Sequence, residues 1–275
     1  MEIIDGRKIR DEILNNLKFK IQNSELKPTL VIILVGDNKA SAAYVQQKML
    51  AGEKIGAKVI VEHLEEQVTQ EEVEELIKKL NKDPAVHGII LQLQLPKHLD
   101  SDRLTSLILI EKDVDGFVPG SKFKPATAKG VIELLKRSDV GIKGKKAVVV
   151  GRGKIAGKPT AELLEEEGAD VEVVHSKTEN PRDITRKADI LVSAVGKPNL
   201  ITADMVKPRA VVVDVGINPV DPITNNQKPI TKLVGDVDFE NVKKVASKIT
   251  PVPGGVGPMT VAALMQNLVE ASQIS

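Results

Sequence analysis

The 275-residue sequence has no cysteine and no tryptophan, and it contains only one tyrosine and four phenylalanines. Without cysteine there is no disulfide, no thiolate nucleophile and no cysteine-ligated zinc, and this composition fits a reducing compartment. With so few aromatic rings, the chain lacks the platforms on which the bases of single-stranded nucleic acids stack. A formal net charge of +1 provides no general attraction for nucleic acids either.

Long hydrophobic runs are also missing. No stretch approaches the roughly 18 consecutive apolar residues of a membrane-spanning helix. Charged residues occupy the N-terminus, where a signal peptide would need an apolar core. We therefore expect a soluble, cytoplasmic protein that binds neither membranes nor nucleic acids, and its length allows one large or two medium domains.

Alternating helical and strand patterns predict an α/β fold with two α/β lobes. In the first half, the patterns predict helices at 6–22, 41–55 and 71–80 and strands at 30–35, 58–62 and 88–93. In the second half, they predict strands at 147–150, 171–174, 190–193, 211–215 and 232–234, and helices near 131–135, 159–167, 239–246 and 258–272. We expect parallel sheets covered on both faces, and a ligand cleft between the lobes at the carboxyl ends of their strands.

The clearest motif follows the predicted strand 147–150, where Gly151, Gly153 and Gly157 lead into a predicted helix. Strand, glycine-rich turn and helix in this order form the phosphate-binding corner of a Rossmann unit. The first glycine permits a tight turn, the second lets N–H groups approach a pyrophosphate, and the third lets the helix pack closely on the strand. The motif predicts dinucleotide binding, with an ordinary strand-to-helix turn as the alternative.

The choice of dinucleotide depends on the end of the next predicted strand, at His175. Proteins that bind NAD often carry an acid there for the ribose hydroxyls, but Ser176 and Lys177 follow here, and Arg152 lies in the first turn. Hydroxyl and cationic groups suit a 2′-phosphate. NADP is therefore preferred, and NAD remains possible.

Three polar side chains of the first half are candidates for a site. Tyr44 and Lys48 lie four residues apart on one face of a predicted helix, and the simpler interpretation is a ring at the edge of the core beside a solvated lysine. Gln92 follows an apolar strand, where an unpaired buried amide would cost about 1–3 kcal/mol. Its amide therefore needs a partner in the protein or in a ligand.

Other polar clusters leave alternatives open. Asp113 and Asp115 stand beside Gly116, which indicates either a turn or a calcium loop, but Phe117 and Val118 take the places of further oxygen ligands. The glycine-rich segment 253–260 predicts a close approach of the backbone to a flat ligand, with a flexible loop as the alternative. Structural roles without a metal are expected for His63, His87, His98 and His175.

Six segments resemble the bifunctional methylenetetrahydrofolate dehydrogenase/methenyltetrahydrofolate cyclohydrolase (FolD) family, in the family's order and spacing and over nearly the whole chain. They are SAAYVQQK at 41–48, GIILQL at 88–93, KDVDGF at 112–117, GRGKIAGKP at 151–159, DVGIN at 214–218 and PGGVGPMT at 253–260. The resemblance favours functional roles for Tyr44 and Lys48 over the structural interpretation.

This resemblance implies a folate-binding catalytic domain at 1–120, completed by the C-terminal helix 256–275, and a Rossmann NAD(P)-binding domain at 121–255. It implies NADP-dependent oxidation of 5,10-methylenetetrahydrofolate to 5,10-methenyltetrahydrofolate, and hydrolysis of that product to 10-formyltetrahydrofolate. It also implies a homodimer formed through the nucleotide-binding lobe.

The resemblance further implies roles for single residues. Lys48 would be the central catalytic residue, with Tyr44 positioning it and lining the folate site. Gln92 would hydrogen-bond Lys48, and Asp115 would bind the pterin edge. The remaining expected substrate contacts are Pro253, Gly254 and Gly255, and the expected cofactor contacts are Gly151, Arg152, Gly153, Ser176 and Ile217.

The sequence departs from the family at three places, none of them a residue expected to be catalytic. Gly153 stands where many members have serine, which removes one phosphate donor. Ala126 and Ala128 replace the cysteine and second proline of a Pro-Cys-Thr-Pro segment, and Gln94 replaces a proline. The alternative functions are a shikimate-type NADP dehydrogenase and a non-catalytic nucleotide-sensing module.

Overall fold

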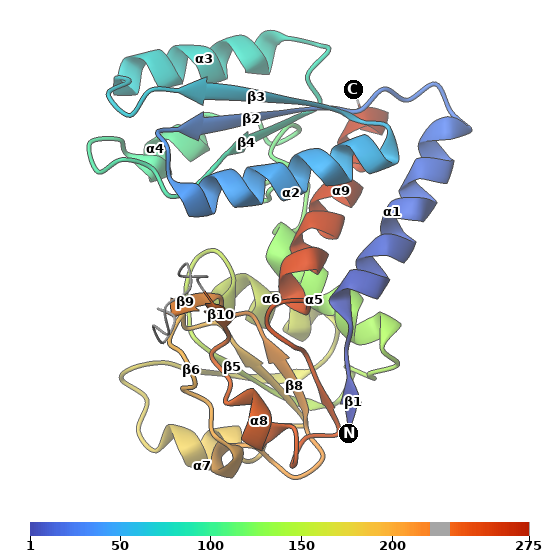
Figure 1. Ribbon diagram of the computed structural model, residues 1–275, viewed down its shortest axis with the longest axis vertical. Helices are drawn as coiled ribbons and strands as arrows, with labels where there is room; N and C mark the ends of the chain where they lie inside the picture. Colours follow the sequence, from blue (N-terminus) through green and yellow to red (C-terminus); the bar gives the residue numbers. More distant parts are fainter. Residues whose placement is uncertain (221–231, 275) are drawn as a thin grey trace, which may run out of the picture. The chain divides into compact units, whose positions relative to one another are not determined.

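The computed structural model describes residues 1–220 and 232–274, and the chain divides into two compact units. Unit 1 consists of Met1–Arg10 and Thr127–Thr260, and unit 2 consists of Asp11–Ala126 and Val261–Ser275. Each unit has its own parallel sheet, which confirms the prediction of two α/β lobes (Figure 1). Three helices contain a boundary between the units, namely α1 (Gly6–Gln22), α5 (Ala126–Arg137) and α9 (Val256–Ile274).

Unit 2 has a three-stranded sheet in the order β3-β2-β4, and all its pairings are parallel. The strands are β2 (Thr29–Val35), β3 (Lys58–Leu64) and β4 (Gly88–Leu91). Helices α2 (Lys39–Ile55) and α3 (Gln70–Lys82) connect the strands, and α4 (Ser101–Ser106) follows β4. Helices α2 and α3 cover opposite faces of this sheet, as expected for strand–helix–strand crossovers (Figure 1).

The central strand β2 explains why two separate cores form in unit 2. All seven of its residues are buried, and successive side chains point to opposite faces of the sheet. On one face, Leu30, Ile32 and Leu34 pack with apolar residues of α1, α2 and α9. On the other face, Val31 and Ile33 pack with residues of α3 and α4.

Unit 1 has a six-stranded sheet in the order β1-β11-β8-β7-β5-β6, again with only parallel pairings. Its strands are β1 (Glu2–Ile3), β5 (Lys146–Val150), β6 (Asp170–Val174), β7 (Ile190–Ser193), β8 (Val211–Asp214) and β11 (Lys248–Ile249). The chain runs from β5 to β6 on one side and then returns to β7 on the other side. The order of the strands therefore reverses at β5, and such a switch point is where doubly wound sheets bind their ligands.

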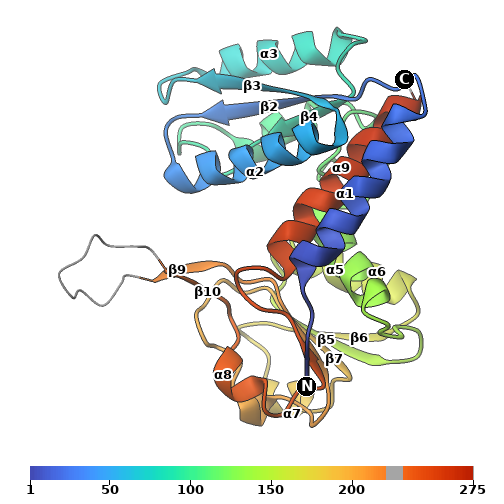
Figure 2. The ribbon, with the colours of Figure 1, turned by 45° about the vertical axis from the view of Figure 1, so that its right-hand side comes forward.

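The remaining elements of unit 1 are short, except for α6. They are α6 (Gly157–Glu166), α7 (Pro181–Thr185), the 3₁₀ helix η1 (Ala203–Met205), α8 (Phe239–Val242) and an antiparallel pair formed by β9 (Asn218–Val220) and β10 (Lys232–Val234). Helix α6 contacts β5 and β6, as the strand–turn–helix motif predicts (Figure 2).

Several expectations needed correction. The sequence does not predict β1, β9, β11, α4 or α7, because these short elements have neither a helical period nor an apolar run of their own. The helix expected at 239–246 ends at Val242, since the chain must turn before β11 begins at Lys248. The strand expected at 88–93 ends at Leu91, so Gln92 and Leu93 lie beyond it.

Residues 221–231 lie outside the described residues. In the described part of the chain, no helix has both the length and the apolar character to cross a bilayer.

Candidate functional site

Lys48 and Gln92 form a buried polar pair in unit 2. The Lys48 Nζ donates a 3.0 Å hydrogen bond to the Oε1 of Gln92, and both residues are 8% exposed. Lys48 comes from α2, and Gln92 directly follows β4, at the carboxyl edge of the sheet. The hydrogen bond expected between these two residues is therefore present.

Gln92 is held by the backbone on both of its sides. Its N–H donates to the carbonyl of Ile33, which continues the pairing of β4 with β2 for one residue. Its Nε2 donates to the carbonyl of Leu93 at 2.7 Å. Because the amide nitrogen is occupied in this way, the amide oxygen is directed at Lys48.

Burial lowers the pKa of the Lys48 ammonium group, because the charged form loses its hydration, and the negative charge of Asp115 partly opposes this shift. A neutral amide compensates a buried ammonium less than a carboxylate does. Burial therefore shifts Lys48 toward its neutral form, which is the form that a proton acceptor needs.

Asp113 and Asp115 lie in the loop after α4, and their surroundings differ. Asp113 is 1% exposed and accepts hydrogen bonds from the N–H groups of Gly116 and Val118, at 3.1 and 2.7 Å. Both of its oxygens therefore hold the loop, and burial raises the pKa of its carboxyl group. The structure supports the turn and not the calcium loop. Asp115 is half-buried and is the acid whose charge reaches Lys48.

Tyr44 lies one helical turn before Lys48 on α2, and 40% of it is exposed. Partial burial raises the pKa of its hydroxyl group, so the ring keeps its proton. The exposed fraction leaves part of the Tyr44 side chain open to a ligand. Because Lys48 is buried, it is not the solvated lysine of the simpler interpretation, and the functional roles of Tyr44 and Lys48 stay a prediction.

In unit 1, the glycine-rich turn follows β5 at the switch point of the sheet. Gly151 has φ +109°, and a Cβ added there would lie 2.3 Å from the carbonyl oxygen of Ala194. A Cβ at Gly157 would lie 2.3 Å from the carbonyl oxygen of Gly151. Any side chain at either position would clash with backbone. A Cβ added at Gly153 would meet no atom within 4 Å, so this side of the turn has the open space that a phosphate would need.

The other expected cofactor residues follow neighbouring strands. Ser176 is exposed in a tight turn after β6, the partner of β5, and Arg152 is exposed in the glycine-rich turn. Ile217 follows β8 and is 38% exposed. The five residues thus lie at one edge of one sheet, in the loops after β5, β6 and β8. Their contacts with a dinucleotide stay a prediction.

The segment with Pro253, Gly254 and Gly255 belongs to unit 1 and is compact. Gly254 has φ +121°, and a Cβ on Gly6 would lie 1.9 Å from the carbonyl oxygen of Gly255. The glycines therefore permit a close approach between two segments of the protein itself. The expected contact of this segment with folate remains a prediction.

Two acids of unit 1 for which the sequence predicts no role are buried. Asp214 ends β8, and Asp236 follows β10, with exposed fractions of 3% and 0%. Asp214 accepts from the N–H groups of Gly216, Asp236 and Val237, at 2.9 to 3.0 Å. Burial raises the pKa of Asp214 to about 6. In the sequence, Asp214 ends an apolar run and begins the DVGIN segment, whereas Asp236 has no such signal.

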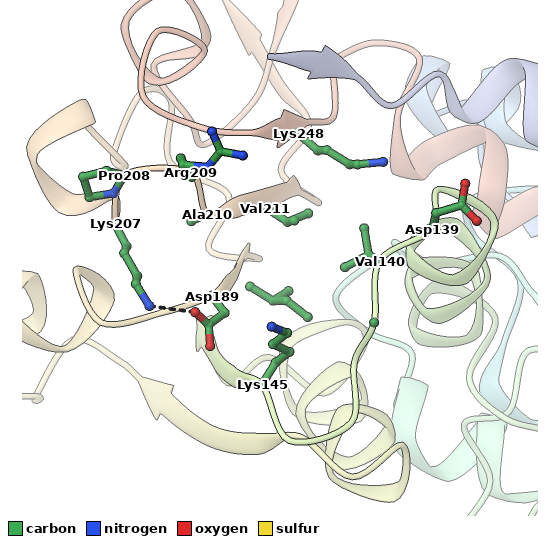
Figure 3. A pocket seen from close by; sticks show the side chains of 12 residues that line it. Asp139, Val140, Lys145, Asp189, Lys207, Pro208, Arg209, Ala210, Val211 and Lys248 are labelled. Atoms are coloured by element: carbon green, nitrogen blue, oxygen red, sulfur yellow. Dashed lines mark hydrogen bonds and ion pairs between the residues drawn. The ribbon is translucent and has the colours of Figure 1, made fainter.

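A cavity of about 390 Å³ lies at the opposite edge of the unit 1 sheet, where β5, β7, β8 and β11 begin (Figure 3). Two of its charged side chains bind each other or the backbone: Asp189 accepts from the Nζ of Lys207 at 2.7 Å and from the N–H of Lys146 at 3.0 Å. None of the expected site residues lines it. Since parallel sheets bind ligands at their carboxyl edges, we place the site at the Gly151 edge and not in this cavity.

The histidines have backbone partners, as expected for structural residues. Each ring contacts a main-chain group, and the four are His63, His87, His98 and His175. Within residues 1–220 and 232–274, no three histidine, aspartate or glutamate side chains gather in a way that could hold a metal ion.

Comparisons with known proteins bear on both units. Residues 4–115 match the model for the catalytic domain of tetrahydrofolate dehydrogenase/cyclohydrolase, and residues 125–275 match the model for its NAD(P)-binding domain. The chain is 48% identical over 275 residues to the bifunctional protein FolD of Acholeplasma laidlawii, with 97% of this chain and 96% of that protein covered.

Two solved structures are similar over the full length. The bifunctional FolD enzyme of Campylobacter jejuni superposes with a TM-score of 0.94 and 44% identity, covering 100% of this chain and 99% of the other. The FolD enzyme of Trypanosoma brucei, solved with NADP and an inhibitor, gives a TM-score of 0.92 and 40% identity, covering 99% and 97%.

Proposed function

This chain belongs to the tetrahydrofolate dehydrogenase/cyclohydrolase family and is a bifunctional enzyme with both activities, and we propose that its chemistry depends on Lys48. The first reaction oxidises 5,10-methylenetetrahydrofolate to 5,10-methenyltetrahydrofolate with NADP. The second hydrolyses the methenyl compound to 10-formyltetrahydrofolate. The observation that carries the proposal is the buried amine of Lys48, held by the neutral amide of Gln92.

The hydrolytic step needs a proton acceptor. Water adds to the cationic methenyl carbon, the bond from that carbon to N5 breaks, and one proton is released overall. A free lysine, with a pKa of about 10.4, is a poor acceptor at neutral pH. Burial favours the neutral amine of Lys48, and the positive charge of the substrate acts in the same direction. Lys48 therefore takes the proton, and Gln92 fixes the position of its Nζ.

Two further residues of unit 2 orient the folate. Asp115 is half-buried and binds the pterin edge, whose N–H groups suit a carboxylate. Tyr44 presents a partly exposed ring one turn from Lys48 and lines the same site. In the oxidation these residues position the methylene carbon, since a hydride transfer depends mainly on the alignment of its two partners.

NADP, when bound, accepts the hydride. The residues that would hold it fit such a group, because Gly151 and Gly157 occupy positions where any Cβ would strike backbone and Gly153 leaves open space. Arg152 and Ser176 supply donors at the same sheet edge, and Ile217 provides an apolar contact. The turn after β6 offers Ser176 and Lys177 instead of an acid, which favours the 2′-phosphate of NADP over NAD.

We also propose a cytoplasmic homodimer formed through unit 1. Strand β6 is an edge of the described six-stranded sheet and pairs only with β5 there. Its Val173 is 36% exposed. An exposed edge strand of this kind is a template for pairing with a second copy. Light scattering of the wild type and of Val173→Lys tests this, and a monomeric wild type would contradict it.

Paired assays test the proposed activities. Wild-type protein is given methylenetetrahydrofolate with NADP, and separately methenyltetrahydrofolate without NADP, and both reactions are followed at the methenyl absorbance. We expect turnover in both assays and loss of hydrolysis in Lys48→Ala. A shikimate-type dehydrogenase would turn over neither folate, and a sensing module would bind NADP without turnover. The family models that match both units support neither of these alternatives.

A further inference from the structure

The side chain of Asp236 accepts five hydrogen bonds at the carboxyl edge of the unit 1 sheet. It is completely buried. Its Oδ2 accepts from the hydroxyl of Ser193 at 3.1 Å, and from the N–H groups of Val195 and Gly196 at 2.7 and 3.1 Å. Its Oδ1 accepts from the N–H of Lys197 at 2.9 Å and the Nδ2 of Asn218 at 3.0 Å.

These five donors come from two loops. Residues 193–197 lie at the end of β7 and in the loop after it, and Asn218 begins β9, four residues beyond the end of β8. Asp236 itself follows β10. One carboxylate therefore connects segments that follow three different strands, all within unit 1.

The connected segments border the glycine-rich turn. Ala194 lies in the 193–197 segment that Asp236 holds. A Cβ on Gly151 would lie 2.3 Å from the carbonyl oxygen of Ala194. A Cβ on Gly216 would lie 2.1 Å from the Oδ1 of Asp236, and Gly216 precedes the expected cofactor residue Ile217. A shift of Asp236 would thus displace two segments beside the expected dinucleotide site, the loop with Ala194 and the segment with Gly216 and Ile217.

We propose that Asp236 is a positioning residue for the dinucleotide, which it holds in place through these loops without touching it. The inference rests on the proposed binding of NADP at Gly151. An ionised carboxylate only accepts hydrogen bonds, so it can satisfy all five donors. An asparagine would turn an NH₂ group toward two or three of these donors and would push the loop apart. The chemistry at Lys48, in the other unit, does not depend on these five hydrogen bonds.

The two activities provide the test, because hydrolysis of methenyltetrahydrofolate needs no NADP. For Asp236→Asn, we expect the KM for NADP in the dehydrogenase assay to rise about tenfold or more. We expect the dissociation constant of NADPH, measured by its fluorescence, to rise in parallel. The rate of hydrolysis without NADP should stay within about twofold of the wild type. Such a split would not arise from a general loss of folded protein, which lowers both activities equally.

Asp189→Asn is the matched control. Asp189 also holds a backbone N–H and a second side chain, but it does so at the opposite edge of the same sheet (Figure 3). We expect this control to lower the melting temperature without changing the KM for NADP. If Asp236→Asn does not fold, Ser193→Ala, which removes one of the five bonds, should raise the KM by about two- to fivefold with hydrolysis unchanged.

An unchanged KM in both Asp236→Asn and Ser193→Ala, or an equal fall of both activities in folded protein, would overturn the inference. Wild-type protein that does not bind NADPH at all would instead overturn the proposed function on which the inference rests.

Discussion

The Nζ of Lys48 lies 3.0 Å from the Oε1 of Gln92, in the interior of unit 2. A buried ammonium is usually paired with a carboxylate, which stabilises the charge. Here the direct partner is a neutral amide. The negative charge of Asp115 raises the pKa of Lys48, but burial lowers it by more. The hydrogen bond to Gln92 fixes the position of the amine without raising its pKa as a carboxylate would.

Replacing Lys48 by arginine tests whether the neutral amine is needed. A guanidinium group remains charged at every accessible pH and cannot accept the proton. We expect the hydrolytic rate of Lys48→Arg to fall about 10²-fold or more, which is the usual contribution of a general base. Lys54→Arg is the control, because Lys54 lies on the same helix and forms a 2.9 Å pair with Asp11 that arginine can also make. Equal hydrolytic rates in Lys48→Arg and wild type would contradict the assignment.

Gln92→Glu should change the pH dependence of hydrolysis without removing Lys48. A carboxylate beside the amine favours the charged form and raises the pKa of Lys48. Hydrolysis uses the neutral amine, so its rate rises with pH up to that pKa. The inflection should therefore move to higher pH in Gln92→Glu. Gln46→Glu adds the same charge at an exposed position of α2 and should leave the inflection in place. If both variants shift it equally, the Lys48–Gln92 contact is not responsible.

The sequence predicted the main elements because their signals are local. Strand β2 is one unbroken apolar run, and the structure buries all seven of its residues. Gly151 could be placed at a tight turn because only glycine adopts its φ of +109° without strain. Gln92 could be recognised as an amide in need of a partner, but the identity of that partner came only from the resemblance.

Other features depend on contacts that no local pattern reveals. Strand β1 has two residues, both exposed, and it exists only because it pairs with β11 near the other end of the chain. Asp236 is an acid between a short strand and a short helix, and nothing near it in the sequence shows that two loops donate five hydrogen bonds to it. Asp113 and Asp115 stand two residues apart, and only their surroundings separate the loop-forming acid from the acid near Lys48.

Gly153→Ser should strengthen the binding of NADP. A Cβ at this position meets nothing within 4 Å, and the φ of Gly153 is not in the left-handed region, so a side chain fits. A hydroxyl group there can donate to a phosphate, and one added hydrogen bond of about 1 kcal/mol corresponds to roughly fivefold in affinity. Gly153→Ala, which lacks the hydroxyl, should bind NADPH as the wild type does. A titration in which serine and alanine behave alike would count against a phosphate at this turn.

Gly151→Ala, in the same turn, should weaken the binding of NADPH. The added Cβ would lie 2.3 Å from the Ala194 carbonyl oxygen, and φ would remain at +109°. We expect a loss of stability of about 1–3 kcal/mol or more from this strain, with a large loss of NADPH affinity. Thermal unfolding and the NADPH titration measure the two effects. Wild-type affinity in this variant would show that the backbone of the turn does not shape the cofactor site.

Asp214 should make unit 1 less stable as the pH rises from about 4 to about 6. Its pKa is about 6 in the folded protein, above the value of 3.8 expected when it is unfolded. Between these values the folded state holds a proton that the unfolded state has released, so the free energy of unfolding falls with rising pH. The destabilisation is complete above about pH 6 and is on the order of 3 kcal/mol, since each pKa unit corresponds to about 1.4 kcal/mol.

Asp214→Asn isolates this effect, because its amide carries no charge at any pH and its lost hydrogen bonds cost the same at each pH. Urea unfolding of both proteins at several pH values between about 4 and 7 gives the difference in stability. We expect the wild type to lose about 1–3 kcal/mol relative to Asp214→Asn across this range. Asp139→Asn, at an exposed position of the same unit, should show a constant difference. A constant difference for Asp214→Asn as well would mean that this buried carboxyl group keeps its ordinary pKa and that its three N–H donors compensate its burial fully.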